Sequence, residues 1–192
     1  MTDLLVRDGC VVDGSGRPPF RGDVAIENGR ITHVGPVNGS RADRVIEARG
    51  RVVCPGFVDP HTHYDAQLHW DPWATPSNVH GVTSVISGNC GFTLAPLRPA
   101  DADYTRRMMA SVEGMPVAAL EQGVKWDWES FDEFLGQLDG NLGVNAGFLV
   151  GHCAVRRYVM GADAVGQEAT ADQVTEMVRV LEESIDAGGL GF

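Results

Sequence analysis

The sequence predicts an α/β protein with two parts: a small β-sandwich or β-lobe over residues 1–56, and an α/β part with parallel strands over residues 57–192. Three observations support this prediction. Short strand-like runs with tight-turn residues fill the first part. Continuous apolar runs recur in the second part, and helical stretches with capping residues separate those runs.

The N-terminal part is dense in short β signals. Asp8-Gly9 lies between LLV and CVV, and Asn28-Gly29 lies between DVAIE and RITHVG. Because type I′ turns need positive φ at both central residues, these dipeptides between β-rich runs predict two hairpins. Apolar and polar residues alternate along the runs, which predicts sheets with one solvated face.

Four apolar runs in the second part predict parallel strands. They are FVDPHTH at residues 57–63, GVTSVISGN at 81–89, AGFLVGHC at 146–153 and GGLGF at 188–192. Continuous apolar runs without alternation are typical of strands that are covered on both faces. The last run is only the beginning of a fourth strand.

Helical segments separate these runs. The stretches that begin at Ser130 and Thr170 have the capping-box pattern, in which Glu or Gln follows a Ser or Thr after three residues. Apolar residues at helical spacing follow both boxes, and a weaker pattern predicts another helix around residues 101–112. Strands that alternate with helices indicate either an open doubly wound sheet or a (β/α)₈ barrel.

Both architectures gather functional groups at the carboxyl ends of the strands. No glycine-rich phosphate-binding pattern follows any of the runs, so nothing favours the nucleotide-binding version of the open sheet. Polar residues nevertheless recur at three strand ends, namely His61 and His63, Asn89 and Cys90, and His152 and Cys153.

The composition indicates an acidic, soluble globular protein. A formal net charge of -11 and a sequence pI of about 4.8 argue against a nucleic-acid partner. No run approaches the roughly 18 apolar residues of a membrane span, and MTDLLVRDGC lacks the apolar core of a signal peptide. Four cysteines without a C-x-x-C pair are expected to be thiols or ligands, as in a cytoplasmic protein.

The segment DPHTH contains a candidate metal site. Residues i and i+2 of a strand project to the same side, so His61 and His63 face one point while Thr62 points away. Zinc binds neutral imidazole nitrogens at about 2.0–2.1 Å. Asp59 and Asp65 are expected to orient the two rings from behind.

Cys90, in SGNCG, is the candidate third ligand. Gly88 and Gly91 let the backbone bend there and approach another group closely, which ordinary core packing does not require. A thiolate beside the two imidazoles gives three ligands and an open position, the pattern of a catalytic zinc site. Asn89 and His152 are expected to face the same pocket.

Other charged or aromatic residues are weaker candidates. His69 is expected either at a pocket mouth or in aromatic packing. Glu113, Asp127 and Glu129 are expected to be solvated charges, and the pair Arg156-Arg157 could bind a carboxylate or form a surface salt bridge.

Three segments carry a resemblance to a known family: VVCPGFVDPHTHYDAQ, GVTSVISGNCGFTLAPLRP and LVGHCAVRRYVMG. They resemble the N-terminal part of the amidohydrolase superfamily and, within it, the D-aminoacylase (N-acyl-D-amino-acid deacylase) family. The resemblance runs the whole length of the chain. HTH alone would indicate only the superfamily, whereas HTH together with GNCG is specific.

The resemblance implies a small β-sandwich lobe over residues 1–56, followed by the first half of a (β/α)₈ TIM-type barrel over residues 57–192. It also implies one or two Zn²⁺ ions at the C-terminal ends of the strands, with His61, His63 and Cys90 as ligands. Many related amidohydrolases bridge two metals with a carboxylated lysine. The only lysine here, Lys125, is expected in a loop, which agrees with a thiolate in that role.

The implied reaction is hydrolysis of the amide bond of N-acyl-D-amino acids or related small-molecule amides by a metal-activated water. In the family the general-base aspartate comes from the last barrel strand, and further histidine ligands come from the fifth and sixth. No catalytic residue is therefore expected within this chain. Residues 57–192 cover about half of the roughly 250 residues of a complete barrel, so we expect part of an enzyme.

Two alternatives remain open. The first is a cyclic-amide (hydantoinase-like) hydrolase, which GNCG and the absence of a lysine on the fourth strand disfavour. The second is a non-catalytic truncated or split subunit whose barrel a second chain completes. A homo-oligomer is compatible with each of these readings.

Overall fold

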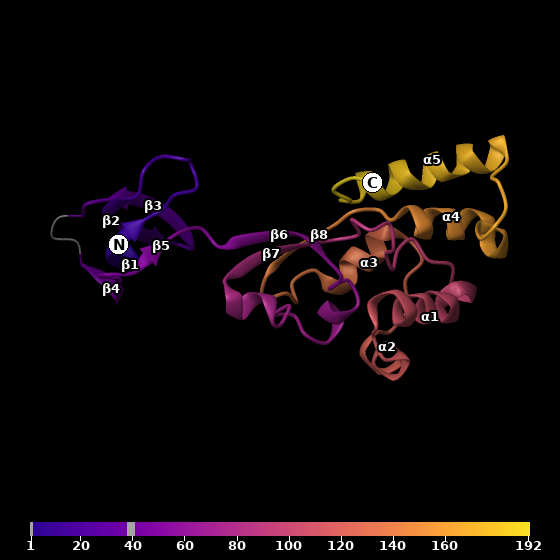
Figure 1. Cartoon of the computed structure of the whole chain (residues 1–192), viewed down its shortest axis with the longest axis horizontal. Helices are drawn as coiled ribbons and strands as arrows, with labels where there is room; N and C mark the ends of the chain where they lie inside the picture. Colours follow the sequence, from indigo (N-terminus) through magenta and orange to yellow (C-terminus); the bar gives the residue numbers. More distant parts are fainter. Residues whose placement is uncertain (1, 38–40) are drawn as a thin grey trace. The chain divides into compact units, whose positions relative to one another are not determined.

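The computed structural model describes residues 2–37 and 41–192. The chain forms two compact units, Met1–Gly56 and Phe57–Phe192 (Figure 1). The described residues of the first unit form strands and loops, whereas the second unit combines parallel strands with helices. The predicted α/β class, with a β-rich N-terminal lobe before the first strands of a barrel, is confirmed.

Five strands form one sheet in the first unit. They are β1 (Thr2–Val11), β2 (Phe20–Glu27), β3 (Arg30–Gly35), β4 (Ala42–Glu47) and β5 (Val52–Val53). The order is β3-β2-β1-β4, and β5 also pairs with β1. β2 is antiparallel to β1 and β3, whereas β4 and β5 run parallel to β1.

The predicted hairpin at Asn28-Gly29 is confirmed. It joins β2 to β3, and both residues have positive φ, 51° at Asn28 and 72° at Gly29. Asn and Gly adopt this conformation at the lowest cost, so the dipeptide fixes where the chain reverses.

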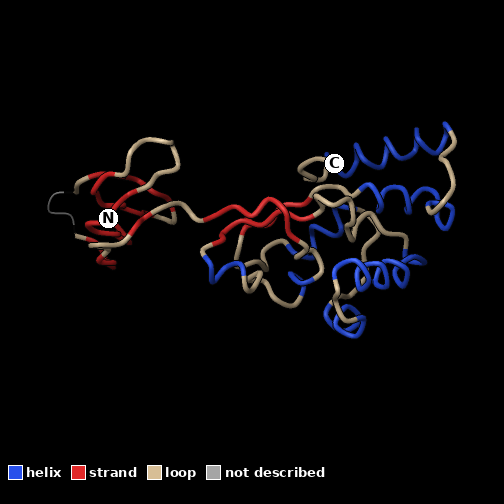
Figure 2. Tube along the Cα trace, viewed as in Figure 1, coloured by secondary structure: helices blue, strands red, loops and turns tan. Residues whose placement is uncertain are grey.

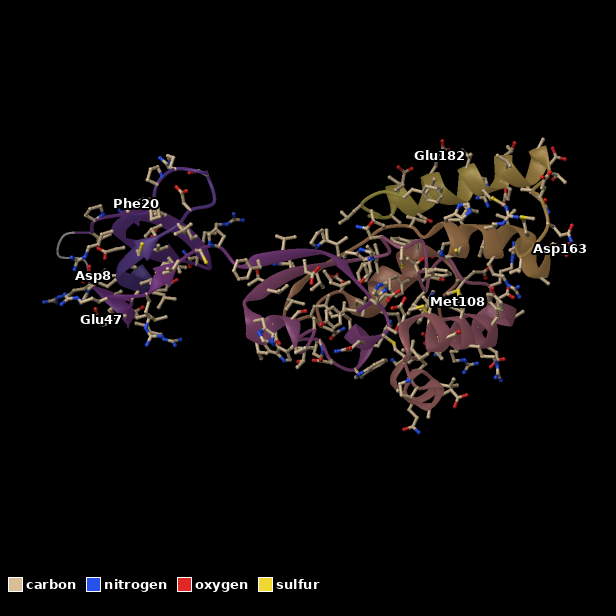
Figure 3. All side chains as sticks on the ribbon, viewed as in Figure 1. Asp8, Phe20, Glu47, Met108, Asp163 and Glu182 are labelled. Atoms are coloured by element: carbon tan, nitrogen blue, oxygen red, sulfur yellow. The ribbon has the colours of Figure 1, made fainter. Side chains whose placement is uncertain are left out.

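The predicted hairpin at Asp8-Gly9 is wrong, because β1 runs through both residues. Asp8 does have a positive φ of 59°, but the pairing with β2 shifts between Val6 and Gly9, which marks a β-bulge. The Asp8 carboxylate (Figure 3) pairs with Arg21 and Arg49, and their guanidinium groups hold its pKa well below the usual range. An Asp-Gly pair supplies positive φ for a bulge as readily as for a turn.

The second unit contains a parallel sheet of β6 (Phe57–Thr62), β7 (Val82–Ser87) and β8 (Asn145–Phe148), drawn in red in Figure 2. The strands pair in chain order, β6-β7-β8. A barrel adds strands in this way, whereas a doubly wound sheet reverses its order at a switch point. The observed order, without a switch point among these three strands, is consistent with the barrel.

The third strand is shorter than the run 146–153 suggested. β8 ends at Phe148, and His152 begins the helix α4 (His152–Met160) instead of ending a strand. The segment 188–192 lies beside β8, since the Leu190 N–H donates to the Phe148 carbonyl (2.9 Å) and the Val150 N–H to that of Gly191 (2.8 Å). The segment thus pairs with the end of β8 where a fourth strand was predicted, although no strand is assigned to it.

The described residues form five α-helices. Between β7 and β8 lie α1 (Ala102–Glu113), α2 (Val117–Gly123) and α3 (Phe131–Leu138); after β8 come α4 and α5 (Ala171–Asp186), which pack side by side (Figure 1). Short 3₁₀ helices occupy Gln67–His69, Ser77–His80, Pro99–Asp101 and Gly161–Ala164. None of the described helices is long and apolar enough to cross a membrane.

Both predicted capping boxes are confirmed. The Ser130 hydroxyl accepts from the Glu133 N–H (3.1 Å) while the Glu133 carboxylate accepts from the Ser130 N–H (3.0 Å). Thr170 and Gln173 make the same two bonds at the start of α5. The weaker prediction of a helix over residues 101–112 corresponds to α1, whereas α2, of seven residues, has no clear signal in the sequence.

Aromatic side chains lie at the core of the second unit. Trp128 is 2% exposed, and its indole N–H donates to the Leu94 carbonyl (3.1 Å). The Phe134 ring packs against Trp128 (5.4 Å between centroids) and against Phe148 of β8 (5.2 Å). His69 stacks on Trp128 at 5.4 Å, and burial lowers its pKa to about 4, so its ring is neutral at pH 7.

Gly88, directly after β7, allows two segments to approach closely. Its φ is 99°, and a Cβ there would lie 2.6 Å from the Leu149 carbonyl oxygen and 2.9 Å from Cγ2 of Thr93. A backbone oxygen cannot move aside without displacing the end of β8. Only glycine therefore fits between β7 and the loop that contains Cys90.

We expect Gly88→Ala to lower the free energy of unfolding by more than about 1 kcal/mol, because positive φ and the clash with a backbone oxygen act together. The matched control is Gly136→Ala in α3, where an added Cβ meets nothing within 4 Å; this change should be neutral or stabilise by up to about 1 kcal/mol. Thermal unfolding of both variants measures the difference. Melting of Gly88→Ala at the wild-type temperature would contradict this account.

Candidate metal centre

The end of β6 presents two histidines on one face. Thr62, between them, points the opposite way: its hydroxyl donates to the Ile86 carbonyl (2.9 Å) and lies 3.1 Å from the Ser87 hydroxyl, in the buried contact with β7. The rings of His61 and His63 are 5.4 Å apart between centroids. The strand alternation that the sequence suggested is therefore present.

The loop after β7 brings Cys90 to these histidines. Gly88 and Gly91 both have positive φ, and the Gly91 N–H donates to the Gly88 carbonyl (2.9 Å), which closes a tight turn around Cys90. The Asn89 side chain donates to the Pro60 carbonyl (3.0 Å) and so ties this turn to β6. Asn89 thus acts on the backbone beside the site.

The three side chains can reach a common ion. One ligand atom from each of His61, His63 and Cys90 lies within 4.8 Å of the other two. With bonds of about 2.0–2.3 Å, the ligand atoms of a tetrahedral zinc site lie roughly 3.3–3.8 Å apart. Two imidazoles and a thiol are donors that zinc prefers, so this set fits such an ion. It is the only such group among the described residues.

The two aspartates expected behind the histidines occupy different surroundings. The Asp59 carboxylate accepts a hydrogen bond from the backbone N–H of His61 (3.2 Å). This contact is with the main chain and not with the imidazole ring. Asp65 is 2% exposed, and its Oδ2 has no hydrogen-bond partner. Burial, and then the nearby charge of Glu113, raise the pKa of Asp65 to about 7.

Glu113 was expected to be a solvated charge, and that expectation is wrong. Its side chain is only 8% exposed, and its Oε1 lies 2.9 Å from Nδ1 of His63. Glu113 is the last residue of α1 and continues the face on which Thr105 and Met109 are buried, because residues four apart share one side of a helix. This spacing could have identified it, had the helix pattern been stronger.

His152 and Cys153 lie at the start of α4, beside the loop that contains Cys90. His152 is exposed and its ring packs against Phe192, 5.8 Å between centroids. The Cys153 N–H donates to the Gly91 carbonyl (3.0 Å). Burial, followed by the neighbouring Cys90, raises the pKa of the Cys153 thiol. Neither residue belongs to the group of three ligands.

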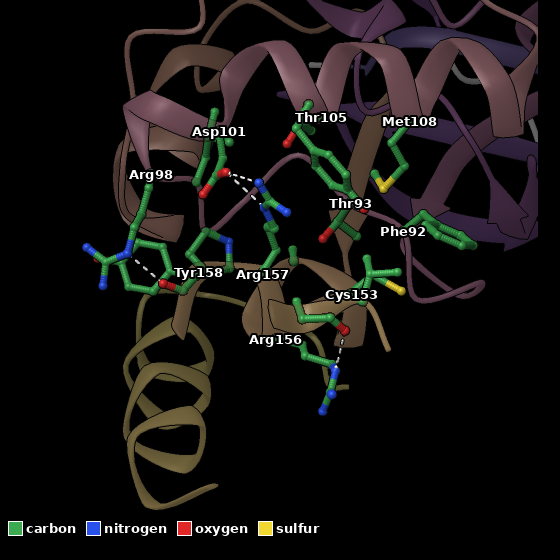
Figure 4. Close-up of a pocket in the computed structure, with 16 residues that line it drawn as sticks. Phe92, Thr93, Arg98, Asp101, Thr105, Met108, Cys153, Arg156, Arg157 and Tyr158 are labelled. Carbon is green, nitrogen blue, oxygen red and sulfur yellow. Dashed lines mark hydrogen bonds and ion pairs between the residues drawn. The ribbon is translucent and has the colours of Figure 1, made fainter. Parts of the chain in front are cut away.

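A cavity of about 180 Å³ lies between α1, α4 and the segment 92–98 (Figure 4). Arg157 enters it, pairs with Asp101 and lies over the Tyr104 ring (3.9 Å to the centroid). Arg156 turns away to the Ala164 carbonyl (2.9 Å). The arginine pair is thus occupied by contacts within the fold. His61, His63 and Cys90 do not line this cavity.

The only lysine of the chain does not lie on a strand. Lys125 is exposed in the segment between α2 and α3, and that segment is held in place by the buried neighbours Val124 and Trp128.

Comparison with known proteins relates these features to a family. The amidohydrolase family model matches residues 44–192. The D-aminoacylase and the N-acyl-D-aspartate deacylase of Alcaligenes xylosoxydans xylosoxydans are each 34% identical, over 99% and 98% of this chain and 37% and 36% of their own lengths. An uncharacterized protein of Mycobacterium tuberculosis is 33% identical over 99% of this chain and 32% of its own. The chain thus spans about a third of these relatives.

Comparison with solved structures relates the chain to the same group of enzymes. A structure of D-aminoacylase concerned with its binuclear metal center matches with a TM-score of 0.82 at 34% identity, over 100% of this chain and 38% of that one. The N-acyl-D-glutamate deacylase of Bordetella bronchiseptica, complexed with zinc and a phosphonate inhibitor, matches over the same shares with a TM-score of 0.79 at 27% identity. The chain belongs to the amidohydrolase family and corresponds to the N-terminal part of its D-aminoacylase-type members.

Proposed function

We propose that this chain is the N-terminal part of a zinc-dependent amidohydrolase that hydrolyses N-acyl-D-amino acids, with His61, His63 and Cys90 as metal ligands. The observation that carries the proposal is the meeting of these three side chains at the carboxyl ends of β6 and β7. Barrel enzymes place their catalytic groups at this face. The names of the relatives support the substrate class.

The chemistry follows from the donor set. When bound, zinc polarises an acyl carbonyl and lowers the pKa of a coordinated water toward about 7. The residues of this chain supply ligands: His61 and His63 are held by the Thr62 anchor, and Cys90 by its glycine-flanked turn. The general-base aspartate and further histidine ligands are proposed to lie on later strands, as in the longer relatives.

Cys90 is proposed to take the role that a carboxylated lysine has in many related enzymes. A thiolate is a compact anionic donor and can lie close to two ions at once. The exposed Lys125 is not on a strand but in the segment between α2 and α3, so it does not match the lysine of those enzymes. This proposal leaves open one or two zinc ions at the site.

We expect His61→Ala, His63→Ala and Cys90→Ser each to weaken zinc binding by at least about 100-fold, more than the 10–100-fold typical of residues that only support a ligand. The measurement is zinc competition with a chromophoric chelator, using the natural protein at full length. Matched controls are His33→Ala in β3 and the exposed Cys10→Ser in β1. Undiminished zinc in the variant with all three ligands replaced would refute the site.

We expect the full-length protein to release the amino acid from N-acetyl-D-amino acids, to lose this activity on treatment with a chelator, and to regain it with zinc. The same substrates in the L configuration and a hydantoin serve as comparisons. Turnover of the hydantoin alone would replace the proposal by a cyclic-amide hydrolase. Tight zinc binding without hydrolysis of any amide would instead indicate a non-catalytic protein.

A further inference from the structure

We infer that Glu113 is a positioning residue that orients the His63 ring toward the metal. This inference rests on the proposed function, because it concerns the same site. It follows from where α1 ends, from what surrounds the Glu113 carboxylate, and from the chemistry of the imidazole that faces it.

The α1 helix ends at Glu113 and places this residue beside His63. Thr105 and Met109 are 6% and 0% exposed on the face of α1 that turns inward, and Glu113 follows one turn later. Gly114 then ends the helix with a φ of 67°. The side chain of Glu113 is therefore fixed at the end of a packed helix, where it does not depend on a mobile loop.

The Glu113 carboxylate faces the ring of His63. Its Oε1 is buried without a hydrogen-bond partner, and it lies 2.9 Å from Nδ1 of His63, within ion-pair distance. The buried Asp65 is a second acidic group close by. A buried carboxylate oxygen without a hydrogen bond is costly, and the nearest polar atom to Oε1 that the structure shows is Nδ1 of His63.

An imidazole beside this oxygen gains a defined orientation. A neutral histidine carries its proton on one ring nitrogen and a lone pair on the other. A small rotation of the ring would let the Nδ1 N–H donate to this oxygen, which favours the proton on Nδ1 and leaves Nε2 to bind the metal. Cys90 Sγ, 3.8 Å from the same Nδ1, is a weaker acceptor. Glu113 thus also leaves the Cys90 sulfur available for the metal.

The test uses Glu113→Ala and Glu113→Gln in the natural full-length protein, with His63→Ala as reference. Glu182→Gln, on the exposed part of α5 (Figure 3), is the control for loss of one negative charge. Zinc affinity is measured by chelator competition, and Co²⁺ is added to record the thiolate-to-metal charge-transfer band. Thermal unfolding is measured in the presence of a chelator.

We expect Glu113→Ala to weaken zinc binding about 10–100-fold and Glu113→Gln to weaken it less, because the amide oxygen still accepts a hydrogen bond. The cobalt band should persist in both variants, since Cys90 remains a ligand. The unfolding temperature without metal should not fall, because the buried Oε1 of Glu113 makes no hydrogen bond within the fold. If Glu113→Ala does not fold, the nearly isosteric Glu113→Gln carries the test.

Three outcomes would overturn the inference. Wild-type zinc affinity in both variants would leave Glu113 a buried acid without a role at the site. A loss as large as that of His63→Ala, with an altered cobalt spectrum, would make Glu113 a ligand. Failure of the wild-type protein to bind zinc would remove the proposed function itself, and so is distinguishable from the other two.

Discussion

The candidate metal centre depends on how β6 is held against β7. Thr62 lies between the two histidines, and its buried hydroxyl donates to the Ile86 carbonyl and contacts the Ser87 hydroxyl. Because successive side chains of a strand point to opposite faces, this anchor on the covered face fixes the direction of His61 and His63 on the other. Ser87 is only 1% exposed, so its hydroxyl would lose this contact if the Thr62 hydroxyl were removed. We expect this loss to lower the free energy of unfolding by about 1–3 kcal/mol.

The position of Cys90, the third proposed ligand, depends on the segment that follows β8. The Gly151 N–H donates to the Thr93 hydroxyl (3.1 Å), and an added Cβ on Gly151 would lie within 3 Å of both Thr93 and the Gly91 carbonyl oxygen. The Cys153 N–H binds the same carbonyl. The start of α4 therefore supports the turn that contains Cys90 from behind. This contact explains why the chain leaves the sheet at Phe148, well before His152.

The sequence predicted those features that depend on local chemistry. The turn at Asn28-Gly29, both capping boxes and the shared direction of His61 and His63 follow from single dipeptides or from spacing along one element. The bulge at Asp8 and the burial of Glu113 depend on partners distant in sequence, and nothing local distinguishes them from a turn or a surface charge. The residue patterns left an open sheet and a barrel as alternatives for the order of the strands, and the family resemblance implied the barrel.

Asp65 and Glu113 are acidic side chains with buried carboxylate oxygens near His63. Burial, and then the charge of Glu113, raise the pKa of Asp65, and Oδ2 of Asp65 and Oε1 of Glu113 are buried without a hydrogen-bond partner. Such a pair destabilises the isolated fold. A divalent ion held by the neighbouring imidazoles and thiolate would offset that repulsion, since opposite charges favour the ionised carboxyls.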